Sequence, residues 1–123
     1  MKRILLLTLL SLFSVNAMAF YFGPVQRVTP IGYDKYTVVE MFVDSKESSD
    51  FVFRVEDKKI ADKNGVPYKK YVFGGERATF PIKVNNKFIR ERTNGKKYVM
   101  ICAMQVVPQS EIQPEACFNV DLE

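Results

Sequence analysis

Two cysteines are the residues of this chain best suited to do chemistry. Cys102 and Cys117 are the only cysteines among 123 residues, and the chain contains no histidine. Histidine is the side chain most often used as a general base and as a metal ligand, so the chain lacks the commonest residue for either role. Two cysteines outside a CxxC pair cannot build a structural zinc site without further ligands. The sequence therefore predicts no metal and no other cofactor.

No other group of side chains has a spacing typical of an active site. Glu56 and Asp57 are neighbours in sequence and point to opposite faces of a strand. Gly74-Gly75 opens no helix, so it predicts a turn and not a phosphate loop. The lysines are scattered over turns and predict a solvated rim, not a nucleic-acid site. The expectation is a protein that is not an enzyme and has no catalytic residue.

The start of the chain has the pattern of a secretory signal. Lys2-Arg3 is followed by an apolar stretch, Ile4 to Val15, and by a small-residue site, Ala17-Met18-Ala19. A membrane anchor is the alternative, but the apolar run is shorter than the roughly 20 residues that span a bilayer. We predict that residues 1–19 are a cleaved signal peptide and that residues 20–123 form one domain in the periplasm, without stable membrane insertion.

Export to an oxidising compartment favours a disulfide between Cys102 and Cys117. Simple alternation places Cys117 on the same side of a strand as Asn119 and Asp121, opposite Phe118. Cys102 has to face that way for the bridge to form. The spacing leaves two free thiols as the alternative.

The elements that position these residues are strands. Tyr98 to Val107 is almost entirely apolar and predicts a core strand in a sheet that is covered on both faces. Phe51 to Glu56 and Ala78 to Val84 alternate apolar and polar residues, as half-buried strands do. Turn signals at short intervals predict an all-β fold, an immunoglobulin-like antiparallel β-sandwich of about seven strands, with a β-barrel as the alternative.

Two features could bind a partner. Arg27 is the only charged residue between Phe20 and Tyr33, in a predicted short strand from Val25 to Thr29. From its own sequence context it is a surface arginine whose stem lies on the sheet.

The second feature is the last strand, on which four apolar residues share a face: Ala116, Phe118, Val120 and Leu122. An apolar edge needs a strand to pair with, either from its own sheet or from a partner. Completion of its own sheet is the simpler alternative.

Several motifs in this order resemble the N-terminal immunoglobulin-like domain of periplasmic chaperones of the chaperone–usher pilus pathway. They are Arg27-Val28 with Gly32 and the strand Tyr36 to Val43, then Gly74 to Thr79, then Tyr98 to Glu111. The resemblance covers about Val25 to Val120, nearly the whole exported chain but half of such a chaperone. It implies a single-domain relative.

In that family the chaperone lends its seventh strand to a pilus subunit, and an arginine holds the subunit's terminal carboxylate. Arg27 matches that arginine, and a guanidinium presents two parallel donors to a carboxylate. Phe118, Val120 and Leu122 fall where the donated side chains lie. The resemblance implies a chaperone-like protein that binds a pilus or surface-assembly subunit, with an usher as a further candidate partner. The competing hypothesis is a small secreted structural or assembly subunit without chaperone activity.

Overall fold

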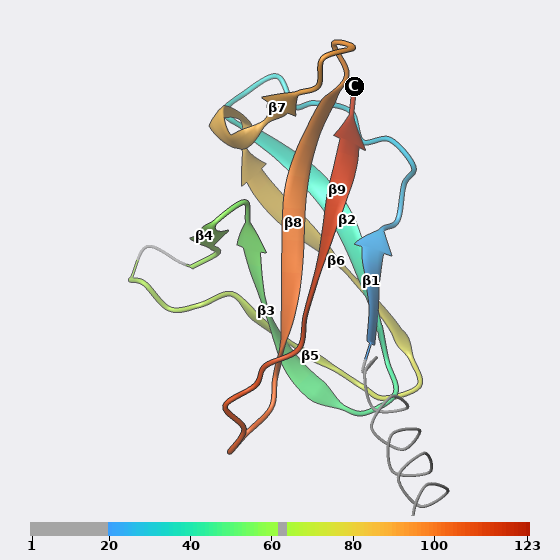
Figure 1. Cartoon of the computed structure of the whole chain (residues 1–123), viewed down its shortest axis with the longest axis vertical. Coiled ribbons are helices and arrows are strands. Elements are labelled where there is room, and N and C mark those ends of the chain that lie inside the picture. Colours follow the sequence, from blue (N-terminus) through green and yellow to red (C-terminus); the bar gives the residue numbers. More distant parts are fainter. Residues whose placement is uncertain (1–19, 62–63) are drawn as a thin grey trace, which may run out of the picture.

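Two antiparallel β-sheets packed face to face make up the computed structural model, which describes residues 20–61 and 64–123 (Figure 1). This arrangement confirms the predicted all-β sandwich. The predicted signal peptide, residues 1–19, lies outside the described residues. Within the described part of the chain, no helix has the length and apolar character needed to cross a membrane.

The smaller sheet has three strands in the order β1 (Phe20–Pro24), β2 (Tyr36–Ser45) and β6 (Arg77–Asn85). The larger sheet has six. Three are long: β3 (Ser49–Val55), β8 (Lys97–Val106) and β9 (Glu115–Leu122). Three are short: β4 (Lys58–Lys59), β5 (Lys69–Val72) and β7 (Arg90–Glu91). A short 3₁₀ helix, η1 (Asn86–Phe88), precedes β7. The described chain thus has nine strands, and the two-residue strands β4 and β7 account for the excess over the predicted seven.

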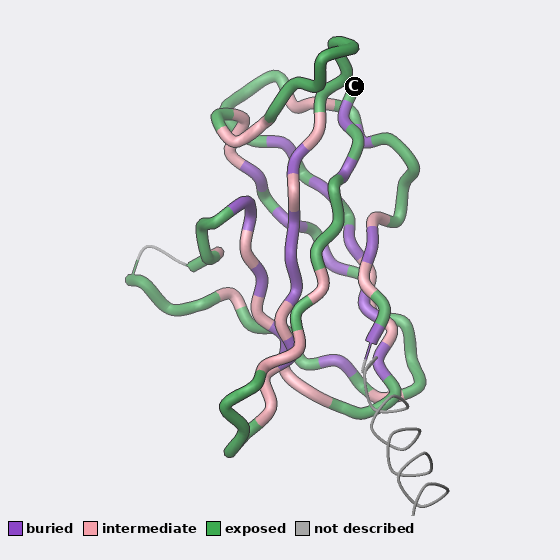
Figure 2. Tube along the Cα trace, viewed as in Figure 1, coloured by how far each residue is buried: buried purple, intermediate pink, exposed green. Residues whose placement is uncertain are grey.

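The core lies between the two sheets, where alternate residues of β2, β3 and β6 and of the C-terminal part of β9 are buried (Figure 2). The apolar alternation predicted for β3 and β6 is confirmed. Aromatic rings join the layers: Phe20 of β1 contacts Phe51 of β3 with ring centroids 4.9 Å apart, and Phe53 contacts Phe80 of β6 at 5.0 Å. Such pairs contribute about 0.5–1.5 kcal/mol beyond the area they bury.

Strand β8 is buried along its core face but only in part on its outer face, where Cys102 alone is fully buried, so the predicted cover on both faces is confirmed only for the core face. Val99, Ile101 and Ala103 face the core and are fully buried. Met100 and Met104 face the other way and are half-buried. The reason is that the sandwich has two layers, and only neighbouring side chains of the same sheet shield the outer face of β8.

The first strand begins earlier than predicted. Strand β1 ends at Pro24, and residues 25–28 form a bend in place of the predicted strand from Val25 to Thr29. Phe20, Phe22 and Pro24 lie on the core side of β1, opposite Ser45, Val43 and Met41 of β2. After the N–H of Val25 donates to the carbonyl of Glu40 (2.9 Å), the chain crosses to the larger sheet. The packing of Phe20 and Phe22 on the core therefore decides where the first strand lies.

Candidate functional site: the free edge of strand β9

Strand β9 borders the larger sheet and pairs along its whole length with β8. On its other side only the last residues have a partner. The N–H of Thr29 donates to the carbonyl of Asp121 (3.0 Å), and the N–H of Glu123 donates to the carbonyl of Thr29 (3.0 Å). From Glu115 to Val120 no described strand pairs with this side, and we call this stretch the free edge.

The backbone groups on the free edge follow from the register. Asp121 and Glu123 turn their polar groups away from β8, and alternation gives Cys117 and Asn119 the same direction. The carbonyl of Met100, which lies opposite Asn119, accepts a hydrogen bond from the N–H of Glu56 (2.8 Å) on the far side of β8. Asn119 is therefore a non-hydrogen-bonded partner of β8. Cys117 and Asn119 present donors and acceptors that an added strand would satisfy.

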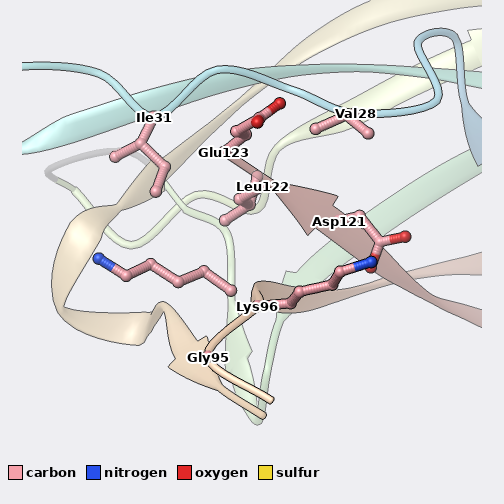
Figure 3. Close-up of a pocket in the computed structure, with 8 residues that line it drawn as sticks. Val28, Ile31, Gly95, Lys96, Asp121, Leu122 and Glu123 are labelled. Atoms are coloured by element: carbon pink, nitrogen blue, oxygen red, sulfur yellow. The ribbon is translucent and has the colours of Figure 1, made fainter.

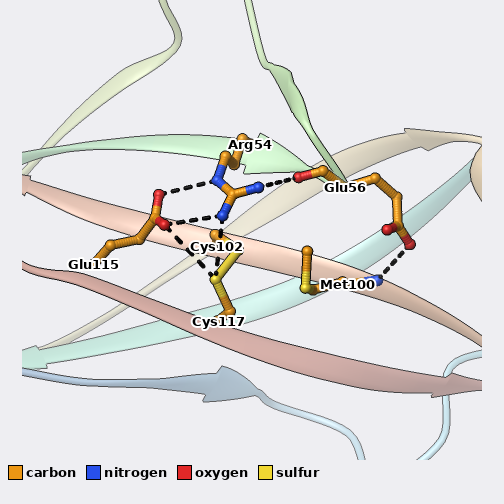
Figure 4. The surroundings of a disulfide bond; sticks show 6 residues. All are labelled: Arg54, Glu56, Met100, Cys102, Glu115 and Cys117. Carbon is orange, nitrogen blue, oxygen red and sulfur yellow. Dashed lines mark hydrogen bonds and ion pairs between the residues drawn. A yellow bond between two sulfur atoms is a disulfide. The ribbon is translucent and has the colours of Figure 1, made fainter.

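A disulfide ties this strand to its neighbour. Cys102 of β8 and Cys117 of β9 lie directly opposite each other, with Cα atoms 4.0 Å apart and an S–S bond of 2.08 Å (Figure 4). The predicted disulfide is confirmed, and both cysteines face the outer side of the sheet. Cys102 is fully buried and Cys117 is exposed. The bridge holds β9 in the larger sheet.

An ion pair lies over the disulfide. Arg54 of β3 donates from Nε and Nη2 to the two carboxylate oxygens of Glu115 (3.0 and 2.9 Å), and its guanidinium also donates to the carbonyl of Glu56 (Figure 4). The hydrogen bond from Arg54 holds the pKa of Glu115 below its ordinary value. The hydrogen bond to Glu115 in turn raises the pKa of Arg54. Arg54 of β3 therefore neutralises Glu115, the only acidic side chain of the free edge.

The same corner brings together atoms that a metal could use. Sulfur atoms of Cys102 and Cys117 and a carboxylate oxygen of Glu115 lie within 4.8 Å of one another. Both sulfurs are bonded in the disulfide, so neither offers the thiolate that metal binding requires. The corner is a cross-link with an ion pair above it.

Phe118 is the member of the predicted apolar face that remains accessible. Its side chain is 42% exposed although it lies on the core side of β9. It stands beside Gly23 of β1, where an added Cβ would be 4.0 Å from the Phe118 ring and 3.2 Å from the ring of Phe42. A side chain at position 23 would crowd the ring of Phe42, so glycine lets that ring lie over β1 next to Phe118.

The other predicted residues of this face belong to the protein's own core. Val120 is fully buried and Leu122 is 5% exposed, while Ala116 is half-buried and packs against the core cluster. Val120 and Leu122 cannot reach a partner while β9 stays in its sheet. A charge at Val120 would therefore disrupt the fold as well as any binding.

We found no match to a protein-family model, to a curated protein or to a solved structure. The function is therefore inferred from the geometry of the chain itself.

Arg27 lies in the bend between β1 and Thr29, not in the strand predicted for it. Its side chain is exposed, and it makes no hydrogen bond or ion pair with the rest of the described chain. Two residues later the chain pairs with Asp121 and Glu123. An unpaired guanidinium thus lies on the segment that closes one end of the free edge.

Beside this end the structure has a hollow of about 430 Å³ (Figure 3). Val28, Ile31 and Leu122 give it apolar walls, and four charged side chains complete it: Lys96, Lys97, Asp121 and Glu123. From the sequence, Lys96 and Lys97 were expected only in a solvated rim. No local pattern could link them to Val28, because the pairing of residues 29–31 with β9 brings the two segments together.

Proposed function

We propose that this protein is a periplasmic, chaperone-like binding protein that holds a pilus or surface-assembly subunit by β-strand addition at the free edge of β9. The observation that carries the proposal is the unpaired, outward-facing backbone of Cys117 and Asn119. An extended segment of a partner would satisfy these groups and gain about 0.5–1.5 kcal/mol for each hydrogen bond.

Side chains next to the edge would add selectivity. Phe118, 42% exposed, is the accessible apolar group of the free edge and is available to contact one apolar side chain of the partner. Val120 and Leu122 anchor β9 in its own core, and the disulfide adds to that anchoring. In this proposal β9 is a fixed template that accepts a strand, in contrast to a donor that inserts all of its apolar residues.

Arg27 supports the proposal through its lack of an internal partner. A free guanidinium at one end of the edge can bind a carboxylate with two parallel hydrogen bonds. We assign to it the acidic terminus of the bound segment. Replacement by alanine is expected to weaken capture and to leave the fold unchanged, since Arg27 contacts no charged group of the described chain.

The test uses a proline at the free edge. Asn119→Pro removes an N–H that points away from β8, so it costs no hydrogen bond within the protein's own sheet. The proteins that co-purify from periplasm are identified by mass spectrometry for the unchanged chain, for Asn119→Pro and for the control Asn119→Ala. We expect one partner to be retained by the alanine variant and lost from the proline variant.

Amide hydrogen exchange gives an independent readout on the complex. The amides of Cys117 and Asn119 are expected to exchange quickly in the free protein and slowly in the complex, whereas those of Phe118 and Val120 are protected in both. Capture that survives Asn119→Pro, with no added protection at Cys117 and Asn119, would exclude strand addition here.

A secreted structural or assembly subunit is the second candidate. The observation in its favour is that Val120 and Leu122 complete the protein's own core, as in a domain that needs no donated strand. Sedimentation equilibrium distinguishes the two functions. Self-association that Asn119→Pro abolishes, with no other protein bound in periplasm, would favour the structural role.

A further inference from the structure

Four lysines lie together on the opposite edge of the larger sheet. Strands β4 and β5 both pair with β3 on the side away from β8. Lys58 and Lys59 lie opposite Val55 and Arg54, and Lys69 and Lys70 lie opposite Val52 and Phe51. We call these four residues the lysine edge. Two segments about ten residues apart in sequence thus form one cationic line.

The charge of the whole chain is concentrated at this edge. The four residues of the lysine edge carry a formal charge of +4, which equals the net charge of the complete chain. The remaining residues therefore balance to zero. No member of the lysine edge is in an ion pair with a described residue, since the ion pairs of the described chain involve only arginines. The ammonium group of Lys70 lies over the ring of Tyr68, 5.1 Å from its centroid, but none of the four lysines has a carboxylate partner. Their charge is therefore available to an external anion.

Aromatic side chains accompany these lysines. Tyr71 and Phe73 follow Lys69 on the outer face of the sheet, and they are 55% and 61% exposed. Their rings contact each other edge to face, with centroids 5.0 Å apart. Rings of this kind, tyrosine above all, suit a boundary between water and lipid, because an apolar body adjoins a polar tip. The edge therefore combines unpaired positive charge with exposed apolar area.

We propose that the lysine edge, with Tyr71 and Phe73, binds the surface of a membrane that contains anionic phospholipids. The ammonium groups would contact lipid phosphates while the two rings enter the headgroup layer. Side chains of the lysine edge point to both faces of the sheet, because their partners on β3 alternate between core and outer face. That spread fits a broad charged plane better than one bound acidic peptide. The free edge of β9, across the sheet, stays open.

Flotation with lipid vesicles tests this inference on the full chain. One set of vesicles contains phosphatidylcholine alone, and the other has about a third of its lipid as phosphatidylglycerol. We expect binding to the anionic set, and Lys58→Gln/Lys59→Gln/Lys69→Gln/Lys70→Gln to weaken it by roughly 100-fold or more. The control Lys83→Gln/Lys87→Gln/Lys96→Gln/Lys97→Gln removes the same charge elsewhere and should weaken binding less than tenfold. All variants keep residues 1–19, so any lipid contact made by that segment is common to them.

A second pair of measurements separates lipid from other anions. Between about 0.01 and 1 M salt the Debye length falls from about 30 to about 3 Å, so high salt screens the attraction between the lysines and the lipid phosphates. The binding to vesicles that remains in high salt should depend on the rings of Tyr71 and Phe73. Tyr71→Ser/Phe73→Ser is expected to abolish that residual part. Equal losses in the two lysine quadruple variants would overturn the proposal. Tight binding to soluble polyglutamate that is unchanged in Tyr71→Ser/Phe73→Ser would also overturn it, because the lysine edge would then bind acidic protein segments and not lipid.

Discussion

The two edges of the larger sheet face an approaching strand with opposite chemistry. The β4 and β5 side is short and carries four lysines without an ion pair, which is how natural sheets discourage edge-to-edge pairing. The free edge of β9 has no basic residue between Glu115 and Val120, and Glu115 is neutralised by Arg54. One side therefore carries charges that oppose strand addition, and the other side carries only the neutralised Glu115.

The edges of the smaller sheet extend this comparison. On β6, Pro81 lies opposite Glu40, whose carbonyl points toward Val25 of the first strand. The nitrogen of Pro81, which carries no hydrogen, therefore lies on the side of β6 that faces away from β2. On β1, the N–H of Val25 points toward β2, so neighbouring Pro24 also directs its nitrogen outward. Of the four sheet edges in the described chain, two carry a proline and one carries lysines, and β9 alone has neither.

The largest effect is expected from a charge on the buried part of β9. Val120→Glu places a carboxylate where the side chain is fully buried, and we expect a loss of more than about 4 kcal/mol in the free energy of unfolding. Phe118→Glu is the matched control, two residues away on the same face but 42% exposed, and should cost less than about 1 kcal/mol. Urea denaturation measures both. Comparable losses would mean that Phe118 is not an accessible residue of the edge.

The disulfide gives the next largest effect. Replacing Cys102 and Cys117 by alanine opens a loop of 15 residues and should lower the unfolding free energy by about 3 kcal/mol. The loss should be local. Amide exchange of Phe118 and Val120 in β9 should accelerate more than that of Val72 in β5, since only β9 is cross-linked. Amide exchange that accelerates equally along both edges would show that the disulfide stabilises the whole fold and not β9 in particular.

Much of the fold was predictable, because alternation in the long strands depends on burial. Phe51, Phe53 and Val55 are apolar in steps of two, and the structure buries all three. The first strand was misplaced because Phe20 and Phe22 pack on a sheet formed by distant residues, while the β-branched residues Val25, Val28 and Thr29 also favour a strand. Local pattern cannot choose between two such segments.

The site was predictable in part. The chain end as an apolar strand and the two cysteines were visible in the sequence, and the structure pairs the cysteines across β8 and β9. Which of the alternating residues stay accessible depends on how the opposing sheet covers them: Phe118 is 42% exposed, whereas Val120 lies inside the sandwich. The lysine edge required the pairing of β4 and β5 with β3, which no spacing of lysines reveals.

Removing the protection of the lysine edge should make the two sides alike. Lys69→Thr/Lys70→Thr keeps strand-forming residues on β5 and deletes both charges, so we expect self-association that rises with protein concentration. Analytical ultracentrifugation measures it, with Lys96→Thr/Lys97→Thr as the control of equal charge. A variant that stays monomeric at high concentration would show that the short length of β5, not its lysines, protects this side.

The smallest effect concerns Glu115, the single charge of the free edge. Its pKa is lowered by the hydrogen bond from Arg54, so the folded state binds the proton less tightly than the unfolded chain does. The ion pair thus stabilises the fold above the unfolded pKa of about 4.3, and this stabilisation is lost as pH falls through the lowered folded value. Because both side chains are about a third exposed, Glu115→Gln should cost only about 0.5 kcal/mol at neutral pH.

The pH dependence of the unfolding free energy shows whether the ion pair between Arg54 and Glu115 neutralises the free edge. The difference in unfolding free energy between the unchanged chain and Glu115→Gln should shrink toward zero in acid, as followed by urea denaturation at a series of pH values. Glu111→Gln, an exposed carboxylate outside every ion pair of the described chain, is the control and should show no such difference. A gap between the unchanged chain and Glu115→Gln that persists in acid would mean that the glutamate acts through packing. In that case the free edge would not owe its neutrality to Arg54.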